Sequence, residues 1–384
     1  LEVDLPDNAV GIYGADVLHL AYDLVAHSCL WMDFDGGRIR AWADATIIGV
    51  TRCGKSQVVQ RLGEHYGGLA TTRSTQNNFS AAGLLAVQQK SARSGQWRSR
   101  PGLVPQSHGR MLVLDEFHLM IDGRTQCSPL EWLQECRDQG TLHVVKAQTV
   151  KYKAAVRLLT IANPIGATGF SSMGHPCEQL FELYGKPECI SRLDFMLAIT
   201  EQTAEEASGV GAPDVPPDPV FTPRICNALI RRAWEIKPED IIFEPEAVQL
   251  AQDTVLAWGA TYSLDLPLYT GLEKVRSILR LAISMANMVM SHVADKPMTC
   301  LVRKCHVKQV VEFLQLTFDL SGYGEYSLRS PDKAQLINSF EVEWFLLKNA
   351  MDAATASNLL RQLYGEFNQN ELMAVMNMTM VQAG

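Results

Sequence analysis

The stretch Gly49-Val-Thr-Arg-Cys-Gly54-Lys55-Ser56 fits the pattern G-x-x-x-x-G-K-[ST]. An apolar run at 45–50 precedes it and an amphipathic segment follows it, so we expect a loop between a strand and a helix. There the glycines let backbone N–H groups surround phosphate, Lys55 neutralises phosphate oxygens and Ser56 offers a hydroxyl to Mg²⁺. The expected nucleotide contacts in this stretch are Gly49, Thr51, Cys53, Gly54, Lys55, Ser56 and Gln57.

Four short apolar runs predict a parallel sheet. They lie at 45–50, 111–114, 156–161 and 195–199, and helical patterns separate them. Strands that are apolar throughout are typical of a sheet buried on both faces. The first part of the chain is therefore expected to be α/β.

The chain changes character after a proline-rich stretch. Residues 203–223 contain five prolines and are typical of an exposed linker. Beyond them apolar residues recur at helical spacing, and Ser330-Pro331 is a helix-start signal. We expect four parts, namely an α/β nucleotide-binding core at 1–202, the linker at 203–223, an all-α lid at 224–322 and a small C-terminal helical or winged-helix-like module at 323–384.

Polar side chains follow the second and third predicted strands, and an arginine precedes the fourth. Asp115 and Glu116 follow the strand at 111–114, where Asp115 would join Ser56 in the Mg²⁺ shell and Glu116 would polarise the attacking water. Asn163 ends the third strand and could hold that water or touch the γ-phosphate. Arg192 precedes the fourth strand and is expected near the same end of the sheet. It is either a solvated cation paired with Asp194 or an arginine finger given to a neighbouring subunit's nucleotide.

The formal charge is −8, from 34 Lys+Arg and 42 Asp+Glu, but it is unevenly distributed. Residues 65–114 contain no acid and carry +6, and residues 139–177 contain none and carry +4. Aromatic residues interleave with the cations, Trp97 between Arg93 and Arg98, and Tyr152 between two lysines. This pattern suits a groove that grips single strands by their backbone, with stacking faces for bases. The alternatives are a solvated basic loop with a packed Trp97, and a bias that serves ATP.

Several classes of protein are disfavoured by the composition. Nine cysteines form an odd number without a CxxC pair, which indicates reduced thiols, and Cys300, Cys305 and His306 lack the four close ligands of a structural zinc site. No run approaches the roughly 20 apolar residues of a membrane span, and no export signal opens the chain. We expect an intracellular protein, in the cytoplasm or nucleoid of a prokaryote or the nucleus of a eukaryote. Because the sequence begins at Leu1, we expect a fragment.

In its order of motifs the chain resembles the AAA+ motor of the minichromosome maintenance (MCM) replicative helicases, from Ile12 to about Phe318. Beside the phosphate loop, the segments that carry the resemblance are Leu114-Asp-Glu-Phe117, Leu142-His-Val-Val-Lys146-Ala147, Ala162-Asn163-Pro164, Ser191-Arg192-Leu193-Asp194 and Ser277-Ile-Leu-Arg280-Leu281.

The resemblance implies an AAA+ P-loop ATPase that uses ATP and Mg²⁺ in a homo-oligomeric, hexameric ring and translocates on DNA through a central pore. Asn163 would be sensor 1 and Arg192 the finger that acts on the neighbour. Lys146 falls at the DNA-contacting lysine of the presensor-1 hairpin. Residues 86–110 take the place of the helix-2 insert hairpin, where Arg93, Arg98, Arg100 and Trp97 are the DNA-binding candidates, with a turn at Ser94-Gly95.

The chain departs from the family's pattern at three points. Gly54 stands where the family has Ala or Ser. The sensor-2 arginine position falls on Glu273 and the following family glutamate on Arg276, so Arg276 is the first sensor-2 candidate and Arg280 the second. The family's N-terminal DNA-binding domain has no counterpart in these residues.

The leading hypothesis is therefore an ATP-dependent DNA helicase motor. One alternative is an AAA+ remodeller or chelatase-like ATPase that acts on protein, whose pore loops would need apolar and aromatic tips. Another is an ATP-binding loader or scaffold subunit that does not hydrolyse, against which the intact Glu116 argues.

Overall fold

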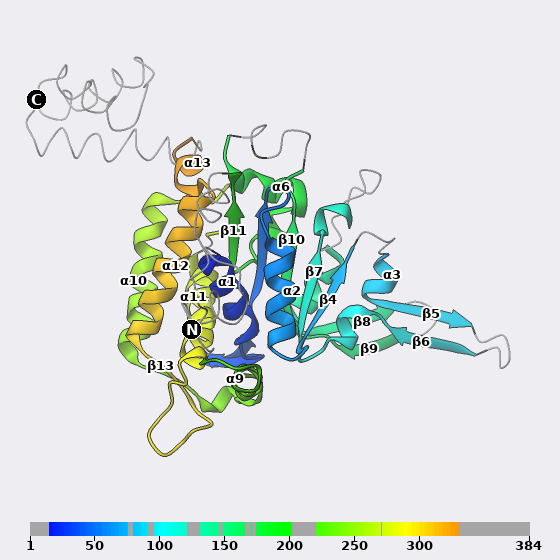
Figure 1. Ribbon diagram of the computed structural model, residues 1–384, viewed down its shortest axis with the longest axis horizontal. Coiled ribbons are helices and arrows are strands. Elements are labelled where there is room, and N and C mark those ends of the chain that lie inside the picture. Colours follow the sequence, from blue (N-terminus) through cyan, green and yellow to red (C-terminus); the bar gives the residue numbers. More distant parts are fainter. Residues whose placement is uncertain are drawn as a thin grey trace, which may run out of the picture.

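The computed structural model describes residues 15–75, 80–90, 96–120, 131–145, 149–165, 170, 174–201, 220–269 and 271–329. At its centre five parallel strands form one sheet (Figure 1). Their order across the sheet is β11 (Phe195–Ile199), β3 (Asp44–Gly49), β10 (Arg157–Ala162), β7 (Met111–Asp115) and β4 (Ala70–Ser74). The α/β class and the parallel sheet are as predicted.

The middle of the sheet is apolar because it is covered on both faces. Every residue of β3, β10 and β11 is buried, including Ile47, Leu159 and Leu197. Burial of one such side chain contributes about 1.5–3 kcal/mol. Strand β4 was not predicted, because Ala70-Thr-Thr-Arg-Ser74 is half-buried or exposed at the sheet edge and lacks an apolar run.

Helices pack around the sheet and lead into a largely helical second part. Helix α1 (Asp16–Ala26) packs on α2 (Lys55–His65), on β10 and on α11 (Gly271–Met288), which is buried over most of its length. Helices α9 (Pro223–Glu235), α10 (Pro245–Thr261) and α12 (Lys304–Leu320) complete this part, with α10 and α12 packed on α11. In Figure 1 these helices lie on the side of β11, away from β4.

The predicted lid is not built of helices alone. Strands β12 (Ile241–Phe243) and β13 (Cys300–Val302) pair in parallel between its helices. Three residues are too few to show a strand period, so this pair could not be predicted. At the linker's end, Pro223 is already the first residue of α9, and 202–219 lie outside the described residues.

The start of the predicted C-terminal module packs on the helical part. Helix α13 (Tyr323–Arg329) buries Tyr323, whose ring stacks on Tyr262 at 5.0 Å and whose hydroxyl donates to the carbonyls of Ser263 and Leu266. Residues 330–384, with the rest of that module, lie outside the described residues.

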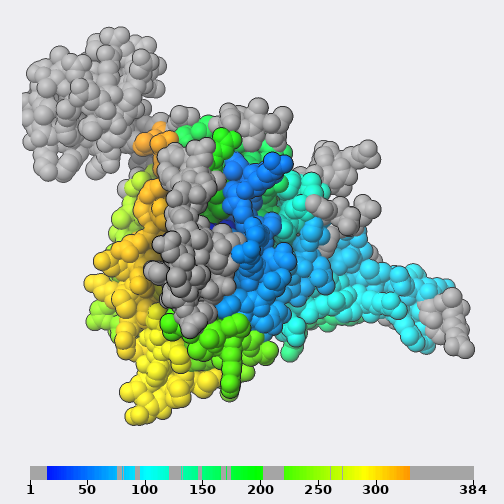
Figure 2. Space-filling view, in the orientation of Figure 1, coloured from blue at the N-terminus to red at the C-terminus, as the bar shows by residue number. Residues whose placement is uncertain are grey.

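The described residues also form three antiparallel hairpins outside the central sheet. They are β1 (Trp31–Phe34) with β2 (Gly37–Arg40), β5 (Ala86–Lys90) with β6 (Trp97–Pro101), and β8 (Thr141–Val145) with β9 (Thr149–Lys153). The last two lie beyond the β4 edge, and Figure 2 shows β5 and β6 as an arm that projects from the body. Short helical segments complete the described chain: α3 (Ala81–Leu84), α4 (Leu103–Gln106), α5 (Gln134–Gln139), α6 (Gln179–Tyr184), α7 (Pro187–Ile190) and 3-10 turns at Phe117–Met120, Glu131–Leu133, Pro176–Glu178 and Pro238–Asp240.

Among the described residues, no helix has both the length and the apolarity to cross a membrane. In the same part of the chain the cysteines are free thiols, and no cluster of three His, Cys, Asp or Glu could hold a metal ion. His306 instead accepts the backbone N–H of Arg303 at the start of α12.

Candidate nucleotide-binding site

A cleft of about 440 Å³ opens where β3, β10 and β7 end side by side. The loop after β3 turns at Gly54, which has φ +83° and stands directly before α2. Gly49 is required for packing, since a Cβ there would lie 2.9 Å from the Cβ of Ile199 and 3.0 Å from Cδ of Lys55. The cleft is lined by Thr51, Arg52, Cys53, Gly54, Lys55, Ser56, Gln57, Asp115, Glu116, Ile161, Ala162 and Asn163.

Lys55 reaches back across the loop. Its Nζ donates to the carbonyls of Gly49 at 2.6 Å and Val50 at 2.8 Å, and to Oδ1 of Asn163 at 3.2 Å. Burial lowers the pKa of Lys55, and within the described residues no carboxylate forms an ion pair with it. An anion in the cleft would balance this charge, as the phosphate-loop pattern predicts.

Two oxygen ligands suited to Mg²⁺ lie together at the cleft. The hydroxyl of Ser56 donates to Oδ1 of Asp115 at 3.0 Å, from the first turn of α2 to the end of β7. Mg²⁺ prefers hard oxygen ligands and is typically held by one or two protein groups and several waters. The donor set therefore fits Mg²⁺.

Glu116 is held in a conformation that L-residues seldom adopt. Its φ is +58°, its N–H donates to Oδ1 of Asp115 at 2.8 Å, and the hydroxyl of Thr75 donates to its carbonyl at 2.5 Å. Ser74 donates to Oε2 of the carboxylate at 2.6 Å. Ser74 and Thr75 were missed by sequence reasoning because β4, whose end they form, carries no strand signal.

Asn163 lies between Lys55 and a histidine that the sequence did not single out. The Asn163 N–H donates to Nδ1 of His118 at 3.2 Å, and Nδ2 of its amide lies 3.5 Å from Nε2 of the same ring. Burial, with the nearby charge of Lys55, lowers the pKa of His118 although Glu116 and Asp115 oppose this. His118 lies in the 3-10 turn directly after Glu116, which is the signal that could have found it.

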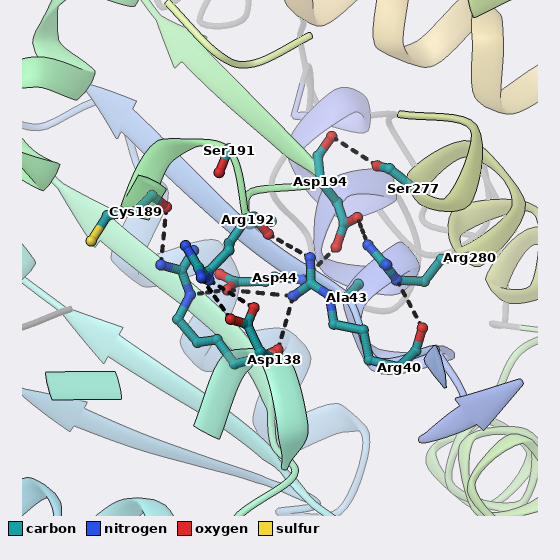
Figure 3. Close-up of polar contacts among 12 residues, drawn as sticks. Arg40, Ala43, Asp44, Asp138, Cys189, Ser191, Arg192, Asp194, Ser277 and Arg280 are labelled. Atoms are coloured by element: carbon teal, nitrogen blue, oxygen red, sulfur yellow. Dashed lines mark hydrogen bonds and ion pairs between the residues drawn. The ribbon is translucent and has the colours of Figure 1, made fainter. Parts of the chain in front are cut away.

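The prediction that Arg192 lies near this end of the sheet is wrong. The N–H of Asp194 donates to the carbonyl of Asp44 at 2.7 Å, which places this segment at the first residue of β3, opposite the phosphate loop. Nor does Arg192 pair with Asp194. Its guanidinium donates through Nε and Nη2 to both carboxylate oxygens of Asp138, at 2.7 and 2.6 Å (Figure 3).

A second cleft, of about 450 Å³, opens beside Arg192. The two sensor-2 candidates differ in how far they are exposed in this cleft. The Arg276 side chain is 30% exposed in the cleft, and its Nη1 lies 3.4 Å from Oε2 of Glu273. The Arg280 side chain is 1% exposed and forms ion pairs with Asp194 and Glu273. Burial would raise the pKa of Asp194, but Arg280 and Arg40 beside it hold that pKa below its usual range. Both arginines line the cleft, but ion pairs tie Arg280 into the core, and Arg276 is the more exposed of the two.

The DNA-binding candidates that the structure describes lie on the β5–β6 hairpin and line neither of these two clefts. Arg98 and Arg100 are exposed on β6, and Trp97 beside them is 42% exposed. Tyr152 is not a free stacking face, because its hydroxyl donates to Oγ of Ser99 at 2.7 Å and its ring packs on the core. Arg93, Ser94-Gly95 and Lys146 lie outside the described residues.

Comparison with known proteins identifies the core. Residues 9–210, just over half of the chain, match the family model of the MCM P-loop domain. No curated protein matches the chain. The matched region spans the phosphate loop, the sheet and the Arg192 segment, and a P-loop domain of this kind indicates a nucleotide-binding ATPase of the helicase family. The chain belongs to the minichromosome maintenance (MCM) family.

Proposed function

We propose that this chain is the ATPase motor of a ring-forming, hexameric DNA helicase that hydrolyses ATP between neighbouring subunits. The observation that carries the proposal is the placement of the two clefts. One holds Lys55, Ser56, Asp115 and Glu116, and the other holds Arg192. The six-residue strand β3 separates them by roughly 16 Å, at about 3.3 Å per residue. Because an arginine side chain cannot span that distance, Arg192 would act on the nucleotide of a neighbouring copy.

Each residue of the assembled site would have a defined role. Lys55 would donate to the β and γ oxygens, and Ser56 with Asp115 would hold Mg²⁺. When bound, Mg²⁺ neutralises charge on the phosphate oxygens. Glu116 would accept a hydrogen bond from the attacking water and take its proton. Arg192 of the neighbour would balance the charge of the transition state, a contribution of about 10³–10⁵ in rate.

The second cleft is suited to receive a neighbour's phosphates. Beneath it lie the buried cations Arg40, Arg137, Arg280 and Lys274, against the buried anions Asp44 and Asp194. Among the side chains that line the cleft, the charges of Arg192 and Arg276 balance those of Asp138 and Glu273. This leaves a cationic excess in a region of low dielectric, where an anion is favoured. Arg276, exposed in that cleft, is our sensor-2 assignment.

The outer hairpins supply the proposed DNA contact. Alternate residues of a strand share a face, so Arg98 and Arg100 lie on one face of β6 while Ser99 on the other contacts Tyr152. On β9, Lys151 and Lys153 are likewise exposed on either side of Tyr152. We call β5–β6 and β8–β9 the basic hairpin pair. Its cations would contact the phosphates of a strand in the pore, together with Lys146 and Arg93.

ATP turnover with and without single-stranded DNA tests the proposal. We expect DNA to stimulate turnover, Lys55→Ala to abolish nucleotide binding, and Glu116→Gln to bind ATP while turnover falls by about 10²–10⁴. Turnover that Glu116→Gln leaves unchanged would contradict the assigned chemistry. A wild type that binds ATP without turnover would instead indicate the non-hydrolysing loader or scaffold subunit.

A protein-remodelling ATPase is the second candidate, because Val145 at the end of β8 is 73% exposed beside the Lys146 position, and Trp97 is also exposed. A salt titration of DNA binding separates the two. Each phosphate contact to a single strand contributes about −0.7 to the log–log slope, so Arg98→Ala with Arg100→Ala should reduce the slope by roughly 1.4. Lys304→Ala with Lys308→Ala, exposed on α12, is the matched control and should leave it unchanged. A wild-type slope near zero favours the remodeller.

A further inference from the structure

The Asn163 side chain is shared between two donors that make incompatible demands. We propose that His118 sets the orientation of the Asn163 amide, so that Asn163 turns its N–H₂ group toward a γ-phosphate when Lys55 is engaged by phosphates. The proposal rests on the function proposed above, since it takes the cleft beside Lys55 as the ATP site. It assigns His118 as a positioning residue that acts through Asn163.

The contacts of His118 fix which ring nitrogen carries the proton. A neutral imidazole has one acceptor and one donor nitrogen. Nδ1 lies 3.2 Å from the backbone N–H of Asn163, a part-buried donor that needs an acceptor. Nδ1 must therefore accept, and Nε2 carries the hydrogen. Burial of the ring, together with the positive charge of Lys55 on the first turn of α2, favours this neutral form against Asp115 at the end of β7 and Glu116 directly after it.

In the structure Nε2 of His118 faces the wrong end of the Asn163 amide. Lys55 Nζ donates to Oδ1 at 3.2 Å, and this leaves Nδ2 directed at Nε2, 3.5 Å away. Both groups are donors, so the pair gains no hydrogen bond. The amide keeps this orientation because the ammonium of Lys55 is the stronger donor for Oδ1.

A phosphate that accepts the hydrogen bonds of the Lys55 ammonium removes the reason for this orientation. Rotation of the amide by about 180° would then let Oδ1 accept from Nε2–H of His118, while Nδ2 takes the place of Oδ1 on the side of the cleft. There Nδ2 can donate to a γ-phosphate oxygen. His118 thereby makes Asn163 a donor when the cleft holds a triphosphate, and ADP lacks the group that Nδ2 would contact.

The test compares affinities for a non-hydrolysable ATP analogue and for ADP, by fluorescence of labelled nucleotides with Mg²⁺. His118→Phe keeps a ring but removes both nitrogens, and we expect its ATP-over-ADP preference to fall by about tenfold while ADP affinity stays within twofold of wild type. His118→Gln retains a side-chain donor and should restore most of the preference. His108→Phe is the matched control, because its Nδ1 also accepts a backbone N–H, that of Ala155 at 3.1 Å, away from the cleft.

Action through Asn163 gives a second readout. In an Asn163→Ala background, His118→Phe should change neither the nucleotide preference nor the residual turnover, because the amide it orients is gone. An additive effect there, or an unchanged preference in the His118→Phe protein that still binds ADP, would overturn this inference alone. If the wild type binds neither nucleotide, the proposed function falls as well. Should His118→Phe not fold, His118→Gln and Asn163→Ala still decide, since Gln must retain more preference than Ala.

Discussion

At the scale of single residues, the backbone of Glu116 is held in a constrained conformation. A left-handed φ of +58° costs about 1–3 kcal/mol in a residue other than glycine and persists only where its surroundings hold it. The hydroxyl of Thr75, which is 3% exposed, supplies that restraint by donating to the Glu116 carbonyl. We therefore expect Thr75 to affect the direction of the Glu116 carboxylate through the backbone that its hydroxyl holds.

Thr75→Val removes this donor and preserves the shape of the side chain. We expect turnover to fall by about tenfold, from the loss of one buried hydrogen bond, while ATP affinity changes less than twofold. Thr75→Ser, which keeps the hydroxyl, should retain most of the turnover. Steady-state turnover and nucleotide titration measure the two effects, and a Thr75→Val protein with wild-type turnover would show that Glu116 needs no such restraint.

Sequence reasoning reached the residues whose spacing is local and missed those that depend on tertiary contacts. The phosphate-loop pattern predicts Lys55 and Ser56, and the strand ends predict Asp115, Glu116 and Asn163; the structure brings all five to one cleft. The contact of His118 with Asn163 arises from pairing between β7 and β10, which no local pattern reveals. Arg192 was assigned to the wrong end of the sheet because strand ends and strand starts were not distinguished.

At the scale of elements, buried ion pairs join the helical part to the sheet. Arg280 on α11 pairs with Asp194 before β11, and Arg137 on α5 pairs with Asp44 at the start of β3. Arg40 adds a link by donating to the carbonyl of Arg192 (Figure 3). It also donates to the carbonyl of Arg137. The segment that carries Arg192 is thereby fixed to two other elements, while the Arg192 guanidinium itself pairs with Asp138, which is 41% exposed.

Asp194→Asn should be strongly destabilising, because it leaves the Arg280 charge buried without a full counter-charge. Breaking a buried pair costs about 3–5 kcal/mol. Urea unfolding of the whole chain measures the change. Asp33→Asn breaks a pair with Arg38 that is exposed on the β1–β2 hairpin, and it should have little effect. Equal loss in the two variants would contradict the role assigned to the buried pair.

A buried carboxyl joins α1 to α2 and should make stability depend on pH. Burial raises the pKa of Asp23 to about 7, against the opposing effect of the hydroxyl hydrogen bond from Tyr66. The folded state thus keeps this proton at pH values where the unfolded state, with a pKa near 3.8, has lost it. The contribution of Asp23 is fully present below about pH 4 and is lost as pH rises to 7, by at most about 1.4 kcal/mol per pH unit.

Asp23→Asn should remove this slope. Burial lowers the pKa values of His19 and His27 to about 4. The contribution of these histidines to stability therefore rises with pH over part of the same range. The informative quantity is therefore the difference in unfolding free energy between wild type and Asp23→Asn, measured from pH 4.5 to 7.5. That difference should shift in favour of the variant as pH rises, and a constant difference would contradict the raised pKa.

Elements were predictable where their apolar pattern was long enough to read. The four central strands and the helices after residue 223 follow from continuous runs or helical spacing. Strand β4 at the sheet edge and the three-residue strands β12 and β13 carry too few apolar residues to be distinguished from loops. Their positions are set by what they pair with, which is information about tertiary structure.

At the scale of the whole molecule, the charge of −8 divides between two regions. Removing the +6 and +4 of the acid-free runs leaves −18 on the other 295 residues. Part of this positive charge is not at the surface. Arg157 is fully buried, with its Cζ 4.5 Å from the centroid of the Trp234 ring. Of the exposed cations of these runs that the structure describes, only Arg73 and Arg110 lie elsewhere than on the basic hairpin pair, so overall acidity does not weigh against a DNA partner.

The central claim is that one ATPase site is shared between two copies of the chain, and mixing two inactive variants tests it most directly. Lys55→Ala lacks the phosphate-binding half and Arg192→Ala lacks the finger, so neither alone should turn over ATP at concentrations where rings form. In an equal mixture, about one quarter of the interfaces of a cyclic ring would join an intact Lys55 to an intact Arg192. We predict that turnover in the presence of single-stranded DNA returns to about that fraction of wild type on mixing. Arg192→Ala with wild-type turnover, or a mixture no more active than its components, would contradict a shared site.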